Sequence, residues 1–322
     1  MGVSIVAGAG ATLPWVPPGL PVVWAVAATM LVVLLIARTV HWIRHTDRAR
    51  ADLLDPTVAP FYGCLAMALL AVGGAALATD VPAAVQIDLV LWAVGSVVAF
   101  VVAAGVPYLM VAHHSIRPGQ AAPTWLLPVV APMVSAALGP PLIPHLPPGQ
   151  ARLAMMLGSL AMFGISLLAT LVLLPPVFSR LLEHGPLPIP LTPTLFLVLG
   201  PLGQSTTTLG NLADADPDQF LAAAVLYGVP VIGFALLWFT FATALVVRAV
   251  HNGMGFAMTW WAFTFPVGTC VTGTASLGRH TGLYALDALA IGLYGFLVIA
   301  VLAAFGGTVR GVLKRELLTA AR

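Results

Sequence analysis

The chain has 322 residues, of which 60% are hydrophobic and only 7% are charged, with a formal net charge of +2. A soluble domain carries about 25% charged residues, so this composition excludes a soluble protein and indicates a polytopic membrane protein with a single membrane domain, residues 1–322. The small net charge indicates no nucleic-acid partner. The two cysteines, Cys64 and Cys270, form no CxxC pair, so we expect two small core residues and neither a disulfide framework nor a zinc site.

Ten apolar stretches are candidate membrane spans. In chain order they are residues 1–13, 20–43, 60–79, 87–112, 123–142, 150–174, 191–212, 219–247, 256–276 and 282–308. The first is too short, because a helix over residues 1–13 reaches about 20 Å against a hydrocarbon core of about 30 Å. We therefore expect a first helix that is truncated at its N-terminus, with a coding frame that continues upstream of Met1. The alternative is a first helix that begins at mid-membrane.

Basic residues are divided unevenly between the two ends of these spans. Of the 13 Lys and Arg residues, only Arg152 and Arg279 follow an odd-numbered span. The other eleven are Arg38, Arg44, Arg48, Arg50, Arg117, Arg180, Arg248, Arg310, Lys314, Arg315 and Arg322. The positive-inside rule places these eleven in the cytoplasm, and an even number of spans then places both termini of this cell-membrane protein there. Aspartates gather on the outer side, with Asp88 near the outer end of the fourth span.

Odd and even spans differ in kind. Even spans, such as VVWAVAATMLVVLLIA, are uninterrupted and suit lipid, whereas odd spans contain prolines and polar residues. Three odd spans share one order: bulky residues, a proline, and a small or polar residue three positions later. These pairs are Pro132 with Ser135, Pro201 with Gln204, and Pro266 with Thr269. The proline spacings of 69 and 65 residues predict five related hairpins, and the alternative is a chance alignment.

Interrupted backbone at membrane depth is tolerated only inside protein or beside water. Proline removes a helical hydrogen bond, and the odd spans carry a row of hydroxyl and amide side chains after their prolines. We therefore expect the five odd helices to line a central pore, surrounded by the five even ones. The alternative for any single hydroxyl is close helix packing. The predicted lining and kink residues are Pro132, Ser135, Pro201, Gln204, Thr207, Pro266, Thr269 and Thr272.

No Asp, Glu, Lys, Arg or His lies in the middle of any predicted span. A charge at a helix centre costs at least about 2.5–3.5 kcal/mol, so intramembrane enzymes and proton pumps retain only the charges that they use. The pair His113–His114 fits an interfacial cap better than a metal site. The sequence thus predicts no enzyme, no cofactor and no metal, and it disfavours strict proton coupling.

Three segments carry a family resemblance: MGVSIVAGAGATLP, HWIRHTDRARADLLDPTVAPFYGCLAMALLAVG and WWAFTFPVGTCVTGT. They resemble the opening, the link between helices two and three, and the ninth helix of the tellurite-resistance/dicarboxylate transporter family, which includes plant slow anion channels. The likeness runs from residue 1 to about residue 305, although Val3 and Ser4 depart from the family's Thr and Gly. It implies ten helices in five hairpins and a homotrimer in the lipid bilayer with one pore per subunit. The implied cargo is a small anion, either a C4-dicarboxylate such as malate or sulfite, with chloride or nitrate conduction and tellurite-resistance-type export as alternatives.

In the resembled family a phenylalanine of the ninth helix plugs the pore. The resemblance maps this gate onto Phe265, directly before Pro266, with Phe263 as the second candidate; the alternative for Phe265 is ordinary core packing. Anion preference rests on the resemblance alone, because carbonyls freed by proline favour cations or water, and an uncharged pore selects by diameter and dehydration. A channel and a coupled carrier both remain open, with a non-transporting scaffold as a third reading.

The predicted orientation can be tested by cysteine labelling in intact cells. Arg44→Cys and Arg117→Cys should resist a membrane-impermeant thiol reagent, because the positive-inside rule places both positions in the cytoplasm. Asp216→Cys should react from outside. Labelling of Arg44→Cys from outside would overturn the orientation.

Overall fold

The computed structural model describes residues 1–314, so Arg315 and Arg322, two of the basic residues assigned to the cytoplasm, lie outside the described residues. Every regular element within this range is a helix. Six of the described helical segments are long and apolar enough to cross a membrane: Leu20–Arg44, Ala59–Ala78, Ala84–Ala112, Gln150–His184, Pro217–His251 and Tyr284–Leu313. The expectation of an all-α, multi-pass membrane protein is confirmed at this level.

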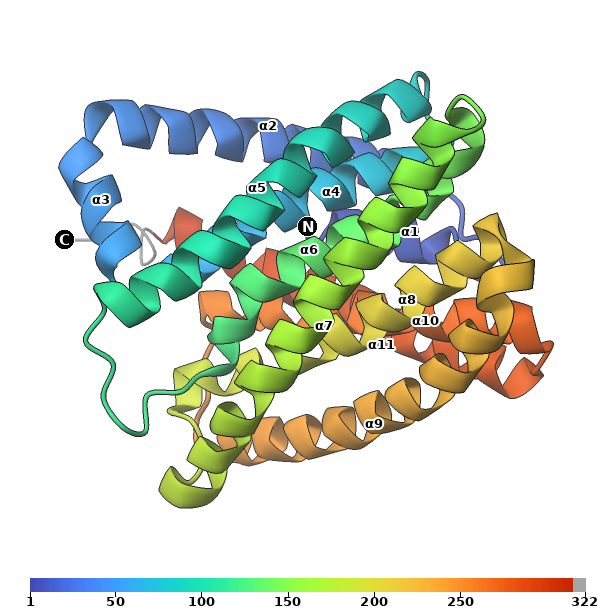
Figure 1. Cartoon of the computed structure of the whole chain (residues 1–322). Coiled ribbons are helices and arrows are strands. Elements are labelled where there is room, and N and C mark those ends of the chain that lie inside the picture. Colours follow the sequence, from blue (N-terminus) through green and yellow to red (C-terminus); the bar gives the residue numbers. More distant parts are fainter. Residues whose placement is uncertain (315–322) are drawn as a thin grey trace.

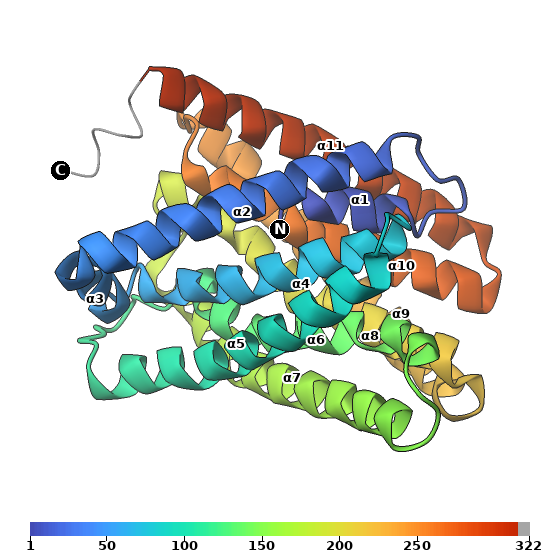
Figure 2. The same cartoon turned by 90° about the horizontal axis from the view of Figure 1, so that it is seen from above.

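Five long helices form the outside of the bundle (Figures 1 and 2): α2 (Leu20–Arg44), α5 (Ala84–Ala112), α7 (Gln150–His184), α9 (Pro217–His251) and α11 (Tyr284–Leu313). Their large apolar side chains are widely exposed, as at Val111 (89%) and Leu226 (77%), which suits contact with lipid. Helix α7 runs well past the predicted end at residue 174, because it continues through Pro175 and Pro176. Prolines are tolerated inside membrane helices where the freed backbone groups find other partners.

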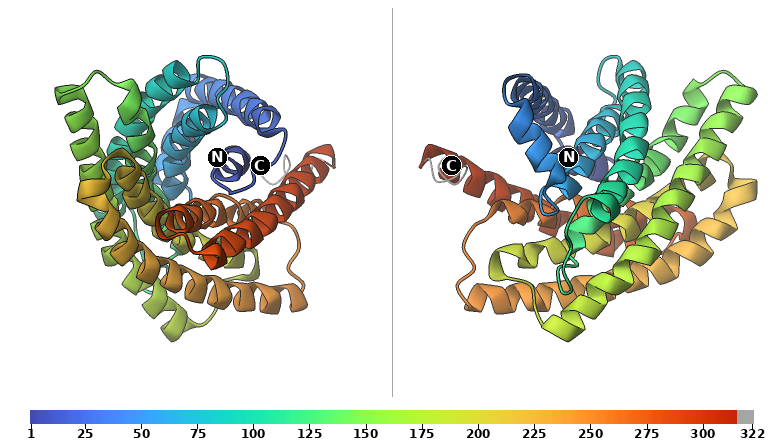
Figure 3. Two further views of the ribbon diagram at one scale, coloured as in Figure 1. Left: turned by 90° about the vertical axis from the view of Figure 1, so that its right-hand side faces the viewer. Right: turned by 60° about the vertical axis from the view of Figure 1, so that its left-hand side comes forward.

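The inner elements are shorter: α1 (Ser4–Gly10), α4 (Gly63–Ala78), α6 (Leu126–Leu138), α8 (Leu199–Ala215) and α10 (Phe265–Thr281). Most residues of α6, α8 and α10 are buried. Contacts close these five elements into a ring, in which α1 packs on α4, α4 on α6, α6 on α8, α8 on α10, and α10 on α1. Figure 3 (left) looks along the bundle and shows α1 within the arc of the other helices, and Figure 2 shows it between α2 and α11.

A 3-10 segment leads into each of four inner helices. These segments are Ala59–Tyr62 before α4, Pro123–Trp125 before α6, Ile189–Val198 before α8 and Met258–Phe263 before α10. Pro201 and Pro266 consequently lie in the first turns of α8 and α10, not inside a continuous helix as the sequence had indicated. The first turn accepts proline because its N–H groups have no intrahelical partner. Pro132, by contrast, does lie inside α6.

The remaining elements are α3 (Thr46–Leu54) and a 3-10 turn, Pro140–His145. Helix α3 follows α2 at the end of the bundle where the five outer helices terminate, on the left of Figures 1 and 2. Arg44, Arg248 and Arg310 lie in the last turns of α2, α9 and α11. Basic residues are therefore concentrated at one end of the bundle, as the orientation argument requires.

Indole groups fix the outer helices to the inner ones. Trp24 on α2 donates to the Val72 carbonyl of α4 at 3.0 Å, and Trp92 on α5 donates to the Ser135 carbonyl of α6 at 2.9 Å. Trp238 on α9 donates in the same way to the Leu195 carbonyl before α8, also at 2.9 Å. Because hydrocarbon offers no hydrogen-bond partner, these contacts satisfy the indole N–H groups inside the protein.

Close packing of α8 on α10 predicts a position that cannot accept a side chain. A Cβ at Gly203 would collide with the backbone of Thr269 and Cys270, so Gly203→Ala should lower stability by about 1–3 kcal/mol through overpacking. The matched control is Gly292→Ala on α11, where nothing lies within 4 Å of the added Cβ. The control should be neutral or slightly stabilising. The measurement is the thermal midpoint of the purified protein, and equal midpoints for the two variants would contradict the close approach.

Candidate functional site

Two cavities lie against the inner ring, and Phe265 is part of the wall of both. The wide cavity has a volume of about 500 Å³ and is lined mainly by apolar residues of α2, α4, α6 and the segment before α10. The narrow cavity has a volume of about 170 Å³ and lies between α1, α4, α8 and α10, towards the opposite end of the bundle. Phe265 is therefore the shared boundary of an apolar chamber and a more polar one.

The two candidate gate residues differ in their surroundings. Phe265 is the first residue of α10 and is only 3% exposed. Thr264, just before it, has φ −90° and ψ −80°, outside regular helix geometry, so the chain direction changes at this point. Phe263 packs edge-on against Phe196, with ring centroids 4.8 Å apart, and lies 6.0 Å from the ring of Trp260. Phe263 thus belongs to an aromatic cluster and lines neither cavity.

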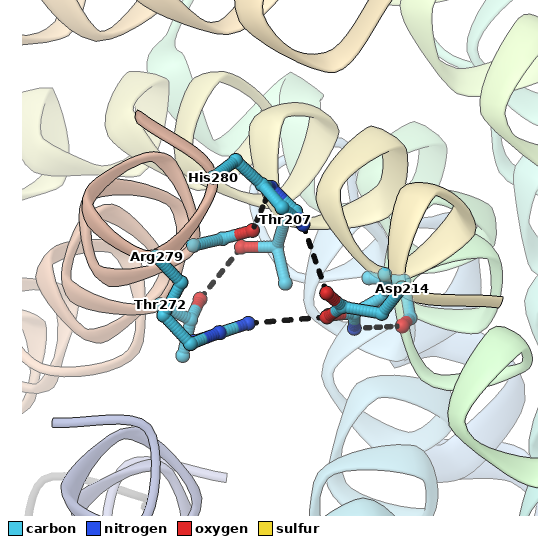
Figure 4. A network of polar contacts seen from close by, with 8 residues as sticks. Thr207, Asp214, Thr272, Arg279 and His280 are labelled. Atoms are coloured by element: carbon cyan, nitrogen blue, oxygen red, sulfur yellow. Dashed lines mark hydrogen bonds and ion pairs between the residues drawn. The ribbon is translucent and has the colours of Figure 1, made fainter. Parts of the chain in front are cut away.

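Three of the predicted lining residues, Gln204, Thr207 and Thr272, are in the wall of the narrow cavity. The hydroxyls of Thr207 and Thr272 share a hydrogen bond of 2.7 Å that joins α8 to α10 (Figure 4). Gln204 is 3% exposed, and its Oε1 has no hydrogen-bond partner in the described part of the chain. Pro266 lines the wide cavity instead.

Other predicted lining residues are in neither wall: Pro132, Ser135, Pro201 and Thr269. The Ser135 hydroxyl shares a 2.5 Å hydrogen bond with that of Ser96 on α5, so it faces an outer helix. The Thr269 hydroxyl donates to the Pro266 carbonyl at 2.7 Å and lies 3.3 Å from that of Gly200. These hydroxyls join helices, which is the alternative role that the sequence left open for single residues.

Sequence reasoning missed a charged group at the narrow cavity. Arg279 lines this cavity, and its guanidinium donates to Asp214 at 3.2 Å. His280 Nε2 lies 2.8 Å from the other oxygen of Asp214 (Figure 4). Phe265, Thr272 and Arg279 are spaced by seven residues on α10, which places them on one helix face. That spacing was a signal in the sequence that could have added Arg279 to the predicted site.

A second missed residue is Asp88, the fifth residue of α5, which also lines the narrow cavity. Its side chain has no exposed surface, and neither carboxyl oxygen has a hydrogen-bond partner among the described residues. The sequence placed Asp88 near an outer helix end, which is correct along the helix axis, but gave no indication of its burial. The prediction against proton coupling considered only the middle of each span and did not include a buried carboxyl near a helix end.

The described residues contain no group of three or more His, Cys, Asp or Glu side chains that could hold a metal ion. Cys64 and Cys270 are both free thiols, with Cys270 buried and Cys64 partly buried. The narrow cavity offers amide, hydroxyl, carboxyl and guanidinium groups for binding.

Comparison with known proteins gives one family and several relatives. The family model named SLAC1, described as voltage-dependent anion channel, matches residues 1–309. Sulfite efflux pump SSU1 of Trichophyton rubrum is 27% identical over 302 residues, covering 87% of this chain and 80% of the relative. The protein of the same name in Arthroderma otae is 27% identical over 325 residues, covering 93% and 84%. An uncharacterized transporter of Methanocaldococcus jannaschii is 27% identical over 271 residues, covering 82% and 76%.

The family match spans nearly the whole chain, including the inner ring and both cavities. It agrees with the resemblance found in the three sequence segments, since the slow anion channels are part of that family. The chain belongs to the SLAC1 family of voltage-dependent anion channels.

Proposed function

We propose that this protein moves small anions across the membrane through its inner ring of helices, along a path that the Phe265 side chain closes. The observation that carries the proposal is the position of Phe265 in the walls of both cavities. Family membership and the sulfite efflux pumps among the relatives support an anionic cargo. The protein acts as a transporter or channel and not as an enzyme.

The proposed gate works by exclusion of water. A phenyl ring between two cavities fills the cross-section and dewets the path, as hydrophobic constrictions do in channels. The backbone break at Thr264 and the proline at position 266 fix the start of α10, and with it the direction of the Phe265 side chain. Phe263 already fills an aromatic cluster, so its environment supports a packing role.

We further propose that the chain has ten membrane segments, arranged as five hairpins of one inner and one outer element, in which α1, with seven residues, reaches only part of the way across. These are α1–α2, α4–α5, α6–α7, α8–α9 and α10–α11. The 3-10 lead before four of the inner helices supports a repeated unit. The segment Met258–Thr281 has a contour of about 36 Å at the rise of an α-helix, comparable with the hydrocarbon core.

The family resemblance supports a homotrimer with one pore per subunit in the cell membrane. The basic last turns gathered at one end of the bundle support cytoplasmic termini. On this orientation the wide cavity opens towards the cytoplasm and the narrow cavity towards the outside.

The proposed cargo is sulfite or a C4-dicarboxylate such as malate. The sulfite efflux pumps among the relatives favour sulfite, and Arg279 and Gln204 in the narrow cavity offer the N–H donors that an oxyanion accepts. The alternatives are passive chloride or nitrate conduction and a tellurite-resistance-type exporter. Reconstitution with a panel of anions at a fixed voltage distinguishes them, because a channel passes its anion without a second solute, whereas a coupled carrier requires one.

Removal of the proposed gate should open the path. Phe265→Ala should raise anion flux through proteoliposomes, because the constriction between the two cavities disappears. Phe263→Ala is the matched control, since it removes an equal ring from the same region but outside both cavities. Phe263→Ala should lower the free energy of unfolding by about 3–5 kcal/mol on the scale of soluble cores. This loss is read as a lower thermal midpoint, and anion flux should not rise. Unchanged or reduced flux from folded Phe265→Ala protein would remove this residue from the gate.

Arg279 should attract anions to the narrow cavity. Arg279→Gln leaves Asp214 without its cation, so we expect anion flux to fall about two- to tenfold at low salt, with a smaller effect at high salt. Arg152→Gln is the matched control, because Arg152 lies at the same end but bonds to the carbonyls of Leu146 and Pro144 and lines neither cavity. An equal loss in both variants would show a general surface effect and contradict a specific role for Arg279.

A further inference from the structure

The Asp88 carboxyl is a polar group without a partner in the protein. It is fully buried in the wall of the narrow cavity, and both of its oxygens lack a hydrogen bond within residues 1–314. Buried polar side chains are paired in the large majority of cases, and an ionisable residue within a membrane segment is costly enough to indicate a function. The partner of this carboxyl must therefore come from the cavity, as water or as a bound solute.

The polar neighbours of Asp88 on the same face of α5 are all paired. Trp92 and Ser96 follow it at intervals of four residues, so they share its face. The Trp92 indole donates to the Ser135 carbonyl, and the Ser96 hydroxyl bonds to the Ser135 hydroxyl. The next residue of α6 in this direction, Leu138, is apolar and lines the narrow cavity with Asp88. The hydrogen bonds from polar side chains of α5 to α6 thus end where the narrow cavity begins.

Helix α4 supplies space but no donor. A Cβ at Gly73 would lie 2.6 Å from Asp88 Oδ1, so the glycine makes room for the carboxyl where the two helices pack. Gly74 and Ala75, next along α4, are also in the cavity wall and carry no polar side-chain atom. The carboxyl of Asp88 therefore has room between α4 and α5, but α4 gives it no hydrogen-bond donor.

Few other charges face this position. Helix α5 packs on α4, α6 and two 3-10 segments. The titratable side chains on these elements are Tyr62, Cys64 and the exposed His145. Tyr62 and Cys64 lie at the start of the antiparallel helix pair, far from Asp88 along the axis. Asp80 is exposed in the loop before α5, and across the cavity Arg279 is held by Asp214.

We propose that Asp88 controls anion occupancy of the narrow cavity through its own protonation. The neutral carboxyl donates its O–H to an oxyanion, together with the amide of Gln204 in the same wall, whereas the charged carboxylate repels the anion. This inference rests on the proposed passage of anions and adds a residue that sets the pH at which the cavity accepts them. Arg279, paired with Asp214, supplies N–H groups to the cavity, and Asp88 supplies a negative charge that depends on pH.

The test compares Asp88→Asn with the wild type in proteoliposomes. The amide keeps the shape and a donor but cannot become charged. Nitrate is the probe, because it stays a monoanion between about pH 4 and about pH 8. Wild-type nitrate flux should fall about tenfold or more as the pH rises over this range, since like charges within one small cavity repel at an effective dielectric of about 20. Asp88→Asn flux should remain high throughout.

The matched control is Asp80→Asn, which makes the same change on an exposed aspartate at the same end and should keep the wild-type fall. Stabilisation of the purified protein by nitrate, read as a rise in Tm, measures occupancy without transport. The rise should vanish at high pH in the wild type and persist in Asp88→Asn. If no anion is transported, the proposed function fails, and the stabilisation experiment still decides the role of Asp88. Equal pH dependence of the wild type and Asp88→Asn in stabilisation would overturn the inference, and Asp88→Ser replaces the asparagine variant if that variant does not fold.

Discussion

Backbone amides and carbonyls in the hydrocarbon core must find hydrogen-bond partners within the protein, and this constraint determines the arrangement of the whole bundle. The inner helices change from 3-10 to α geometry within the apolar part of the chain, at Leu199 and Phe265 among others. Such irregular backbone is stable only when other protein or water surrounds it. The long outer helices supply that cover, and their indoles bond to the inner backbone. Broken helices inside and continuous helices outside are two consequences of one requirement.

The contact between α8 and α10 lies beside the narrow cavity and carries the proposed path. Gly203 allows the two backbones to meet, and the Thr207–Thr272 hydrogen bond joins them beside the narrow cavity. On α10 the heptad spacing of Phe265, Thr272 and Arg279 orders a ring, a hydroxyl and a cation along one face. On the proposed path, an anion that enters from the narrow cavity meets the cation first, then the polar groups, then the aromatic ring. Attraction and closure are thus separated by position along a single helix.

The sequence predicted the outer helices well, because long apolar runs bounded by charged or proline residues leave little freedom for their ends. The exception follows from proline at Pro175, where the outer helix α7 continues past its predicted end. The side chains that face each cavity were harder to predict. A helix that is apolar on all sides has no polar face from which its rotation about its own axis can be inferred, so Ser135 was assigned to the pore although it faces α5.

Asp88 is a second residue whose surroundings could not be predicted from the sequence. Its distance from the helix end was evident, but its burial depends on Gly73 of the preceding helix and on the cavity beside it. Neither is visible in a local pattern, because both arise from contacts between helices. The cavity position of Arg279 was missed for a different reason. Its seven-residue spacing from Thr272 was visible in the sequence, but its place after an odd-numbered span indicated only a role in membrane topology.

The central claim is that anions pass along the α10 face that carries Thr272. Its most direct test is modification of Thr272→Cys by a small membrane-impermeant thiol reagent, in protein whose Cys64 and Cys270 are replaced by alanine. Gln219→Cys is the control, because Gln219 is exposed at the same end and lines neither cavity. We expect modification at position 272 to reduce anion flux and modification at position 219 to leave it unchanged. Complete modification of Thr272→Cys with undiminished flux would contradict a path through the inner ring.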